Sequence, residues 1–62
     1  MWNYAFENVE TGEILFVRTS DHKNALRIME EQLDGFDPDN YEYLDKVSDF
    51  VAEMWGYDTL TD

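Results

Sequence analysis

The chain has 62 residues, with 15 Asp or Glu against 4 Lys or Arg and no cysteine, which gives a net charge of −11. A chain of this length forms one domain at most, and the absence of cysteine excludes disulfides and thiolate metal sites. The negative charge repels nucleic acid and anionic membranes, so it argues against direct binding to them. It attracts basic protein surfaces.

The charge is uneven along the sequence. Residues 1–29 hold four acids against three bases, a sum of −1, whereas residues 30–62 hold eleven acids against Lys46, a sum of −10. Functional residues are therefore expected mainly in the second half. The ten aromatic residues supply enough apolar surface to predict a folded chain. The sequence shows neither a signal-peptide pattern nor an apolar run long enough to span a membrane, which favours a cytoplasmic protein.

Residues 2–19 predict a β-hairpin. Two runs rich in aromatic and branched residues, 2–9 and 13–19, are joined through Glu10, Thr11 and Gly12, which suits a three-residue turn closed by glycine. If Phe6 faces Phe16, one core face collects Trp2, Tyr4, Phe6, Ile14 and Phe16. The reverse face then carries polar side chains but also the apolar Ala5, Val9, Leu15 and Val17. These four favour either contact with a second copy or another partner, or simple partial exposure.

Residues 20–34 predict an amphipathic helix that lies on this hairpin. Ser20 can cap its N-terminus, and Gly35 suits the position after its C-terminus. The expected apolar stripe consists of Ala25, Leu26, Met29 and Leu33, with Ile28 at its flank.

A second helix is predicted over residues 38–55. Asp37 can cap it, Pro38 suits the first helical position, and Phe36 can pack on Tyr41. Asp39 with Glu42 offers an alternative start two residues later. Gly56 ends the helix and residues 56–62 form a tail, in which Tyr57 and Leu60 can pack back on the domain while residues 58–62 are frayed. The apolar face of this helix would consist of Tyr43, Leu44, Val47, Phe50, Val51, Met54 and Trp55.

The opposite face of that helix would carry a ridge of carboxylates. Its members are Glu42, Asp45, Asp49 and Glu53, and the further acids Glu30, Glu31, Asp34 and Asp39 could extend it. Such an array can occupy a groove lined by Lys and Arg through the electrostatics that bind phosphates there. The competing interpretation is an ordinary solvated helix face. Like charges four residues apart destabilise a helix slightly, which favours a role beyond solubility.

Metal and catalytic chemistry have less support. The loop from Asp34 to Asp45 contains many oxygens, but Tyr41, Glu42 and Ser48 stand where a calcium loop needs other residues. His22, beside Ser20 and Asp21, is expected near the surface, because adjacency in sequence does not create a catalytic triad. We therefore expect no enzyme activity, no cofactor and no metal site.

The predicted architecture is α+β, in the order ββαα, with a two-stranded antiparallel hairpin packed on two amphipathic helices. In chain length, acidity after residue 29 and the ridge Glu42, Asp45, Asp49 and Glu53, the chain resembles the small acidic proteins by which phages and mobile elements block host nucleases. These include anti-CRISPR, anti-restriction and DNA-glycosylase-inhibitor proteins. The resemblance concerns composition and layout and includes no family motif.

This resemblance implies a DNA mimic, an inhibitor that covers the basic nucleic-acid-binding surface of a nuclease or of another CRISPR or restriction component. The alternative is a small cytosolic assembly module that binds through the apolar hairpin face, with the acids serving solubility. A homodimer is compatible with either function.

Overall fold

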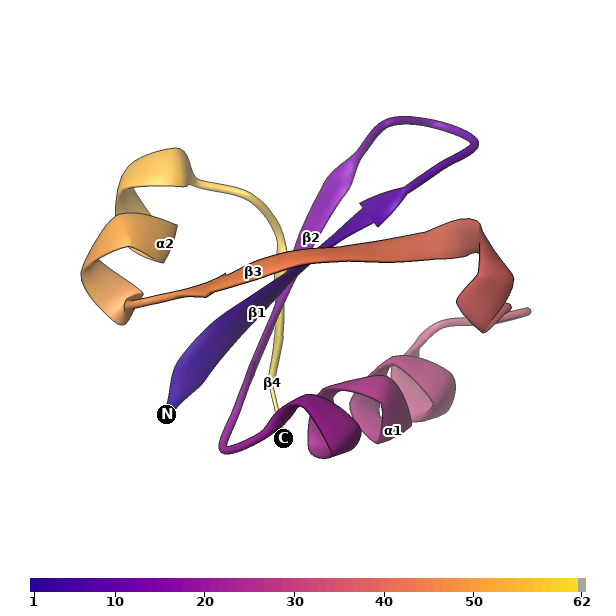
Figure 1. Ribbon diagram of the computed structural model, residues 1–62, viewed down its shortest axis with the longest axis horizontal. Helices are drawn as coiled ribbons and strands as arrows, with labels where there is room; N and C mark the ends of the chain where they lie inside the picture. Colours follow the sequence, from indigo (N-terminus) through magenta and orange to yellow (C-terminus); the bar gives the residue numbers. More distant parts are fainter. Residues whose placement is uncertain (62) are drawn as a thin grey trace.

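The computed structural model describes residues 1–61, which form a four-stranded mixed sheet and two α-helices (Figure 1). The predicted ββαα arrangement, a two-stranded hairpin on two helices, is wrong. The strand order across the sheet is β3-β1-β2-β4. Along the chain the elements are β1 (Trp2–Asn8), β2 (Ile14–Thr19), α1 (His22–Gln32), the 3₁₀ turn η1 (Pro38–Asn40), β3 (Tyr41–Val47), α2 (Asp49–Trp55) and β4 (Thr59–Thr61).

The hairpin of β1 and β2 forms, but its turn is one residue longer than predicted. The Asn8 N–H donates to the Glu13 carbonyl at 2.9 Å, and the Gly12 N–H donates to the Asn8 carbonyl at 2.7 Å. The Asn8 side chain also accepts from the Glu10 N–H at 2.9 Å, and Gly12 has φ 76°. Phe6 therefore pairs with Leu15 instead of Phe16. A shift of one residue turns each side chain of a strand to the other face.

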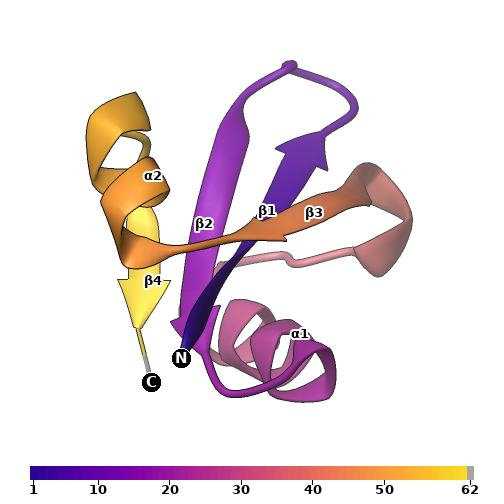
Figure 2. The same ribbon diagram turned by 60° about the vertical axis from the view of Figure 1, so that its left-hand side comes forward.

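The two helices cover opposite faces of the sheet (Figure 2). Consecutive residues of a strand point to opposite sides, and Tyr4 and Phe6 pack with α1 whereas Ala5 packs with Ala52 of α2. The larger cluster consists of Tyr4, Phe6, Val17, Ala25, Ile28 and Met29. The smaller one consists of Ala5, Phe16 and Ala52, with Val47 packed against it.

The predicted apolar partner face does not exist. Ala5 and Val17 are buried on different faces of the sheet, and Leu15 packs against the larger cluster. Val9 is 54% exposed, and it lies in the turn after β1. The one-residue change in register thus divides the four residues between two cores and the surface.

α1 is shorter than predicted and is capped by a different residue. The Asp21 side chain, not that of Ser20, accepts from the Asn24 N–H at 2.8 Å, and the helix ends at Gln32 with Leu33 as its C-cap. Ile28 is fully buried whereas Leu26 is 38% exposed, so the buried stripe is rotated from the predicted one.

The predicted helix over 38–55 is a turn, a strand and a shorter helix. Asp37 caps η1 by accepting from the Asp39 N–H at 3.0 Å, and the Phe36 and Tyr41 rings lie 5.5 Å apart. The predicted cap and ring contact therefore form, but around a 3₁₀ turn and not at the start of a long helix. The next seven residues form β3 because they pair with β1, an interaction between distant residues that outweighs helical periodicity. Ser48 then caps α2, and Gly56, at φ 69°, ends this helix as predicted.

The tail is not loose. Thr59–Thr61 forms β4, which runs parallel to β2 with Leu60 opposite Val17. The Gln32 side chain donates to the Thr61 carbonyl at 2.7 Å and so joins α1 to β4. The predicted tail residue Asp62 lies outside the described residues. Within residues 1–61, neither helix is long and apolar enough to cross a membrane.

Candidate functional site

The predicted carboxylate ridge is divided between two elements. Glu42 and Asp45 lie on β3, and Asp49 and Glu53 lie on α2. Pairing places Asp45 opposite Ala5, and the register shifts between that pair and the next. The four carboxylates therefore do not follow one helix face.

Asp49 is bonded to other elements of the fold although its side chain is about half exposed. Its Oδ1 accepts from Arg18 Nε at 2.9 Å and from Asn3 Nδ2 at 2.7 Å, and its Oδ2 accepts from Arg18 Nη2 at 2.8 Å. Bonds from Arg18 and then Asn3 hold the pKa of the Asp49 carboxyl well below its usual range, and the N-terminal amine contributes. This carboxylate joins β1, β2 and α2 through hydrogen bonds, and the Arg18 guanidinium neutralises its charge.

A different group of carboxylates comes together where β1 ends and β3 begins. Glu7 of β1 lies directly opposite Glu42 of β3. Just beyond this pair, the Val9 N–H donates to the Asn40 carbonyl at 2.8 Å, which holds the hairpin turn beside η1. The turn carries Glu10 and Glu13, Asp37 is the N-cap of η1, and Asp39 lies within η1. We call this group the acid end; its residues are Glu7, Glu10, Glu13, Asp37, Asp39 and Glu42.

The acid end is not neutralised by neighbouring bases. Neither residues 5–17 nor residues 28–45 include a Lys, Arg or His. The ion pairs found among residues 1–61 are Arg18–Asp49 and Arg27–Glu31, so none of the six acid-end carboxylates is in one. Lys23 lines a surface hollow together with Pro38, which lies between Asp37 and Asp39. Lys23 forms no ion pair with either of these acids. The acid end therefore gathers carboxylates without ion pairs, and Lys23 and Arg27 lie beside its η1 edge.

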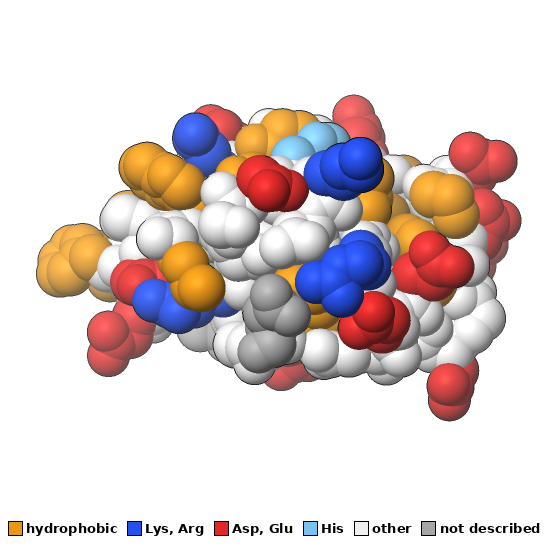
Figure 3. Space-filling model, turned by 90° about the horizontal axis from the view of Figure 1, so that it is seen from below, with side chains coloured by type: hydrophobic (Ala, Val, Ile, Leu, Met, Phe, Trp, Pro, Cys, Tyr) orange, Lys and Arg blue, Asp and Glu red, His pale blue; other side chains and the backbone are white. Residues whose placement is uncertain are grey.

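Two more acids extend this surface. Leu33, at the end of α1, lines a small hollow of about 180 Å³ together with Asn8, Glu13 and Asp58. The C-terminal end of α1 and the segment before β4 thus lie beside the acid end, which brings Asp34 and Asp58 near it. In Figure 3, several acidic side chains protrude along the right-hand end of the molecule with apolar ones among them, and the left-hand end, where Figure 1 places α2, shows apolar side chains together with a few acidic ones.

The structure thus redistributes the predicted partner-binding residues. Glu42 and Asp39 belong to the acid end, and Asp34 borders it. Glu30 and Glu31 lie on α1, where Glu31 pairs with Arg27 at 2.9 Å. Three acid-end residues, Glu7, Glu10 and Glu13, were missed because the charge of the first half sums almost to zero. The signal that could have found them is local, since their segment has acids and no base.

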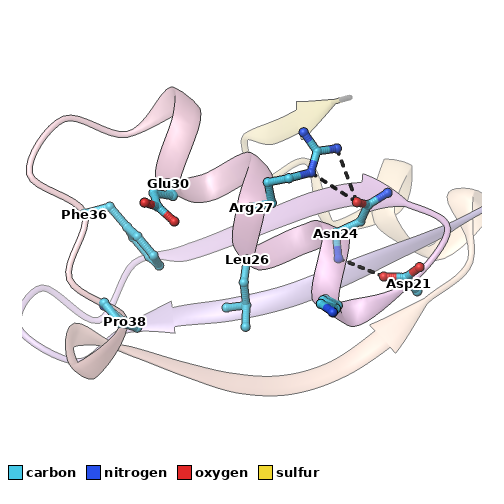
Figure 4. A pocket seen from close by; sticks show the side chains of 8 residues that line it. Asp21, Asn24, Leu26, Arg27, Glu30, Phe36 and Pro38 are labelled. Carbon is cyan, nitrogen blue, oxygen red and sulfur yellow. Dashed lines mark hydrogen bonds between the residues drawn. The ribbon is translucent and has the colours of Figure 1, made fainter.

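A hollow of about 450 Å³ lies between α1 and the segment before β3 (Figure 4). Leu26 and Phe36 face it from the two sides, and Pro38 closes one edge. Two of its charged groups are engaged locally: Asp21 caps α1, and Arg27 donates to Asn24 at 3.2 Å and to Glu31. This wall of mixed charge contributes no excess of either sign to the acid end.

His22 lies at the surface, as predicted, at the start of α1. Its ring contacts Tyr43, with centroids 4.6 Å apart, and stacks on Phe6 at 5.7 Å. The neighbouring Asp21 carboxylate is occupied by its capping bond, so Ser20, Asp21 and His22 do not form a triad. Among residues 1–61, no three His, Asp or Glu side chains gather as metal ligands would.

The sequence and the fold were compared with known proteins. No protein-family model, characterised protein or solved structure matches this chain.

Proposed function

We propose that this chain is a non-catalytic binding protein whose acid end occupies the basic, nucleic-acid-binding surface of a partner and thereby excludes nucleic acid. One observation carries the proposal: pairing of β1 with β3 assembles six carboxylates from two distant segments, with no base in either segment. The expected partner is a nuclease or another Lys- and Arg-rich protein of a restriction or CRISPR system.

The arrangement of these acids costs folding energy, which supports a role in binding. Like charges directly opposite each other on neighbouring strands are destabilising, and Glu7 and Glu42 have this relationship. A basic partner would remove the repulsion and gain attraction, while the sheet holds the carboxylates in place before contact. Positions fixed by backbone hydrogen bonds also reduce the entropy lost on binding.

The alternative function, an assembly module that binds through Ala5, Val9, Leu15 and Val17, loses its predicted surface. Two of those residues are buried in different cores. Large apolar side chains are exposed on several other elements, among them α2, where Phe50 is 72% and Met54 is 69% exposed.

The test captures partners from a nuclease-treated cell lysate on the immobilised protein and elutes them with a short DNA duplex. We expect release by the duplex and by about 1 M salt, at which the Debye length is about 3 Å. A variant with Glu7→Gln, Glu10→Gln and Glu42→Gln should lose capture. The matched control, Glu30→Gln, Asp45→Asn and Glu53→Gln, has the same net charge and should retain it.

Two results would overturn the proposal. One is capture that resists both the duplex and salt. The other is equal loss of capture in the two triple variants, because net charge and not the acid end would then control binding.

A further inference from the structure

The hollow between α1 and the segment before β3 has mainly apolar walls. Leu26 of α1 is 38% exposed and faces Phe36 across the hollow, and Pro38 closes one edge (Figure 4). The volume of about 450 Å³ lies within the range of about 300–1,000 Å³ in which proteins bind small ligands. A hollow of this size can take one large apolar side chain of another molecule.

The fold holds these walls in place. Phe36 packs against the larger cluster, and its ring centroid lies 5.5 Å from that of Tyr41. Asp37 caps η1 and so fixes the turn that contains Pro38. Leu26 projects from a regular helix. A site that is formed before its occupant arrives loses less entropy when it is filled.

The charged side chains around the hollow leave it without a net charge. Asp21 is engaged in the cap of α1, and Arg27 is in an ion pair on the same helix. The side chains of Lys23 and Glu30 have no hydrogen bond or ion pair within residues 1–61. These two lie seven residues apart on one face of α1, so they stand about 10 Å apart along its axis with Leu26 between them. Their opposite charges cancel, and the hollow therefore favours an uncharged occupant.

The turn η1 connects this hollow to the acid end. Pro38 closes an edge of the hollow, and its two chain neighbours, Asp37 and Asp39, belong to the acid end. Neither carboxylate is in an ion pair within the described part of the chain. Consecutive Cα atoms are about 3.8 Å apart, so the chain neighbours of a side chain placed in the hollow lie near these carboxylates. Charge complementarity requires Lys or Arg at those neighbouring positions.

An apolar contact supplies what the acid end lacks. Attraction between exposed charges raises the rate and the selectivity of association more than its affinity, and salt screens this attraction. Most of the binding energy of a protein interface comes from a few large side chains that are buried in pockets. The hollow provides such a pocket beside the acid end.

Building on the proposed function, we propose that the hollow between α1 and η1 binds one large apolar side chain of the basic partner. The Lys or Arg residues next to that side chain contact Asp37 and Asp39. The segment that this protein recognises is therefore basic, with a single large apolar residue between its charges.

Two synthetic peptides separate the apolar contact from the electrostatic one. The first has one phenylalanine between two pairs of lysines, and the second has alanine in place of the phenylalanine, so the two carry equal charge. Isothermal titration calorimetry at about 0.1 M salt measures both. The dissociation constant should be at least about tenfold lower for the phenylalanine peptide, because burial removes its ring from water.

Two matched variants test where this difference arises. Leu26→Gln makes one wall of the hollow polar at an exposed helical position that suits glutamine. It should remove most of the advantage of the phenylalanine peptide and leave the affinity for the alanine peptide unchanged. Leu44→Gln makes the same change at an exposed position of β3 that does not line the hollow, and it should preserve the advantage.

The acid-end variant with Glu7→Gln, Glu10→Gln and Glu42→Gln should weaken both peptides by the same factor. Equal affinities of the two peptides for the original chain would overturn the hollow as a binding site and leave the acid end in place. An advantage that survives Leu26→Gln, or that disappears in Leu44→Gln, would do the same. Affinities unchanged in the acid-end variant would instead contradict the proposed function and not the apolar contact. Binding of neither peptide would overturn both.

Nuclear Overhauser effects in the complex with the phenylalanine peptide locate the contact. We expect them between the ring protons of the peptide and the methyl groups of Leu26. Contacts of the ring with Phe50 or Met54 of α2 would place the apolar contact outside the hollow and would overturn the proposal.

Discussion

Arg18 and Asp49 are joined by two hydrogen bonds, Nε to Oδ1 at 2.9 Å and Nη2 to Oδ2 at 2.8 Å. This contact joins β2 to the first turn of α2 across 31 residues of sequence. Asn3 of β1 donates to the same carboxylate at 2.7 Å, so three elements meet at one side chain. The geometry explains why an acid predicted to bind a partner is a structural residue.

The first prediction concerns this carboxylate. Asp49→Asn should lower the free energy of unfolding at pH 7 more than Glu53→Gln, a change of similar charge on the same helix with no ion pair. The effect should be modest because both side chains of the pair are about half exposed. Urea unfolding of the two variants and the original chain measures it. An equal effect of the two substitutions would contradict the structural role.

The pH dependence of that difference is the second prediction. The pKa of Asp49 is lower in the folded chain than in the unfolded chain, where it is about 3.9. The stabilisation is therefore complete above that value and is lost as the pH falls through the folded pKa. The difference between the original chain and Asp49→Asn should narrow below about pH 4. Urea unfolding across acidic pH checks this, and a widening gap would contradict it.

The third prediction tests the repulsion across β1 and β3. Glu42→Lys should stabilise the fold by about 0.2–1 kcal/mol beyond any general charge effect, because an attractive pair with Glu7 replaces a repulsive one. Glu10→Lys changes net charge equally at a turn position with no opposite strand residue and serves as the control. Urea unfolding provides the comparison. Equal stabilisation by both variants would mean that Glu7 and Glu42 do not interact.

The fourth prediction distinguishes the observed start of α2 from a continuous helix over 38–55. Ser48 accepts from the Val51 N–H at 3.4 Å as an N-cap, so Ser48→Ala should cost about 1 kcal/mol. Alanine in the interior of a longer helix would instead be stabilising. Ser20→Ala, at the cap predicted from sequence but unused in the structure, should change stability by less than about 0.5 kcal/mol. Thermal unfolding followed by circular dichroism measures both.

The fifth prediction compares two phenylalanines of opposite burial. Phe16 is fully buried, so Phe16→Ala should cost about 3–5 kcal/mol, which approaches the whole stability expected for a chain this small. Phe50 is 72% exposed, and Phe50→Ala should leave the fold about as stable as before. Urea unfolding separates the two. A large loss from Phe50→Ala would mean that α2 is packed differently.

The elements with local signals were predicted best. Asp37, Pro38 and Gly56 act where the sequence placed them, because a cap or a turn depends on a few neighbouring residues. The register of the hairpin was not predictable in this way. Ile14, Leu15, Phe16 and Val17 are all apolar, so either face of β2 could have been the core face, and the Asn8 turn decided between them.

β3 was missed for a different reason. Its residues Tyr41 to Val47 contain apolar side chains at both strand and helix spacing, and their partner strand lies more than 30 residues earlier in sequence. The candidate site depends on that pairing, since it brings Glu42 to Glu7. The excess of acids after residue 29 therefore pointed to Asp37, Asp39 and Glu42, which are half of the acid end. It did not predict the strand pairing that places Glu42 opposite Glu7.

The most direct test of the acid end is an NMR titration of the isotope-labelled chain with a lysine-rich peptide. At about 0.1 M salt, we expect the largest amide shift changes at residues 7–13 and 37–42, and their disappearance at about 1 M salt. Changes centred on α2, or spread evenly over the carboxylates of α1, α2 and the sheet, would contradict the account.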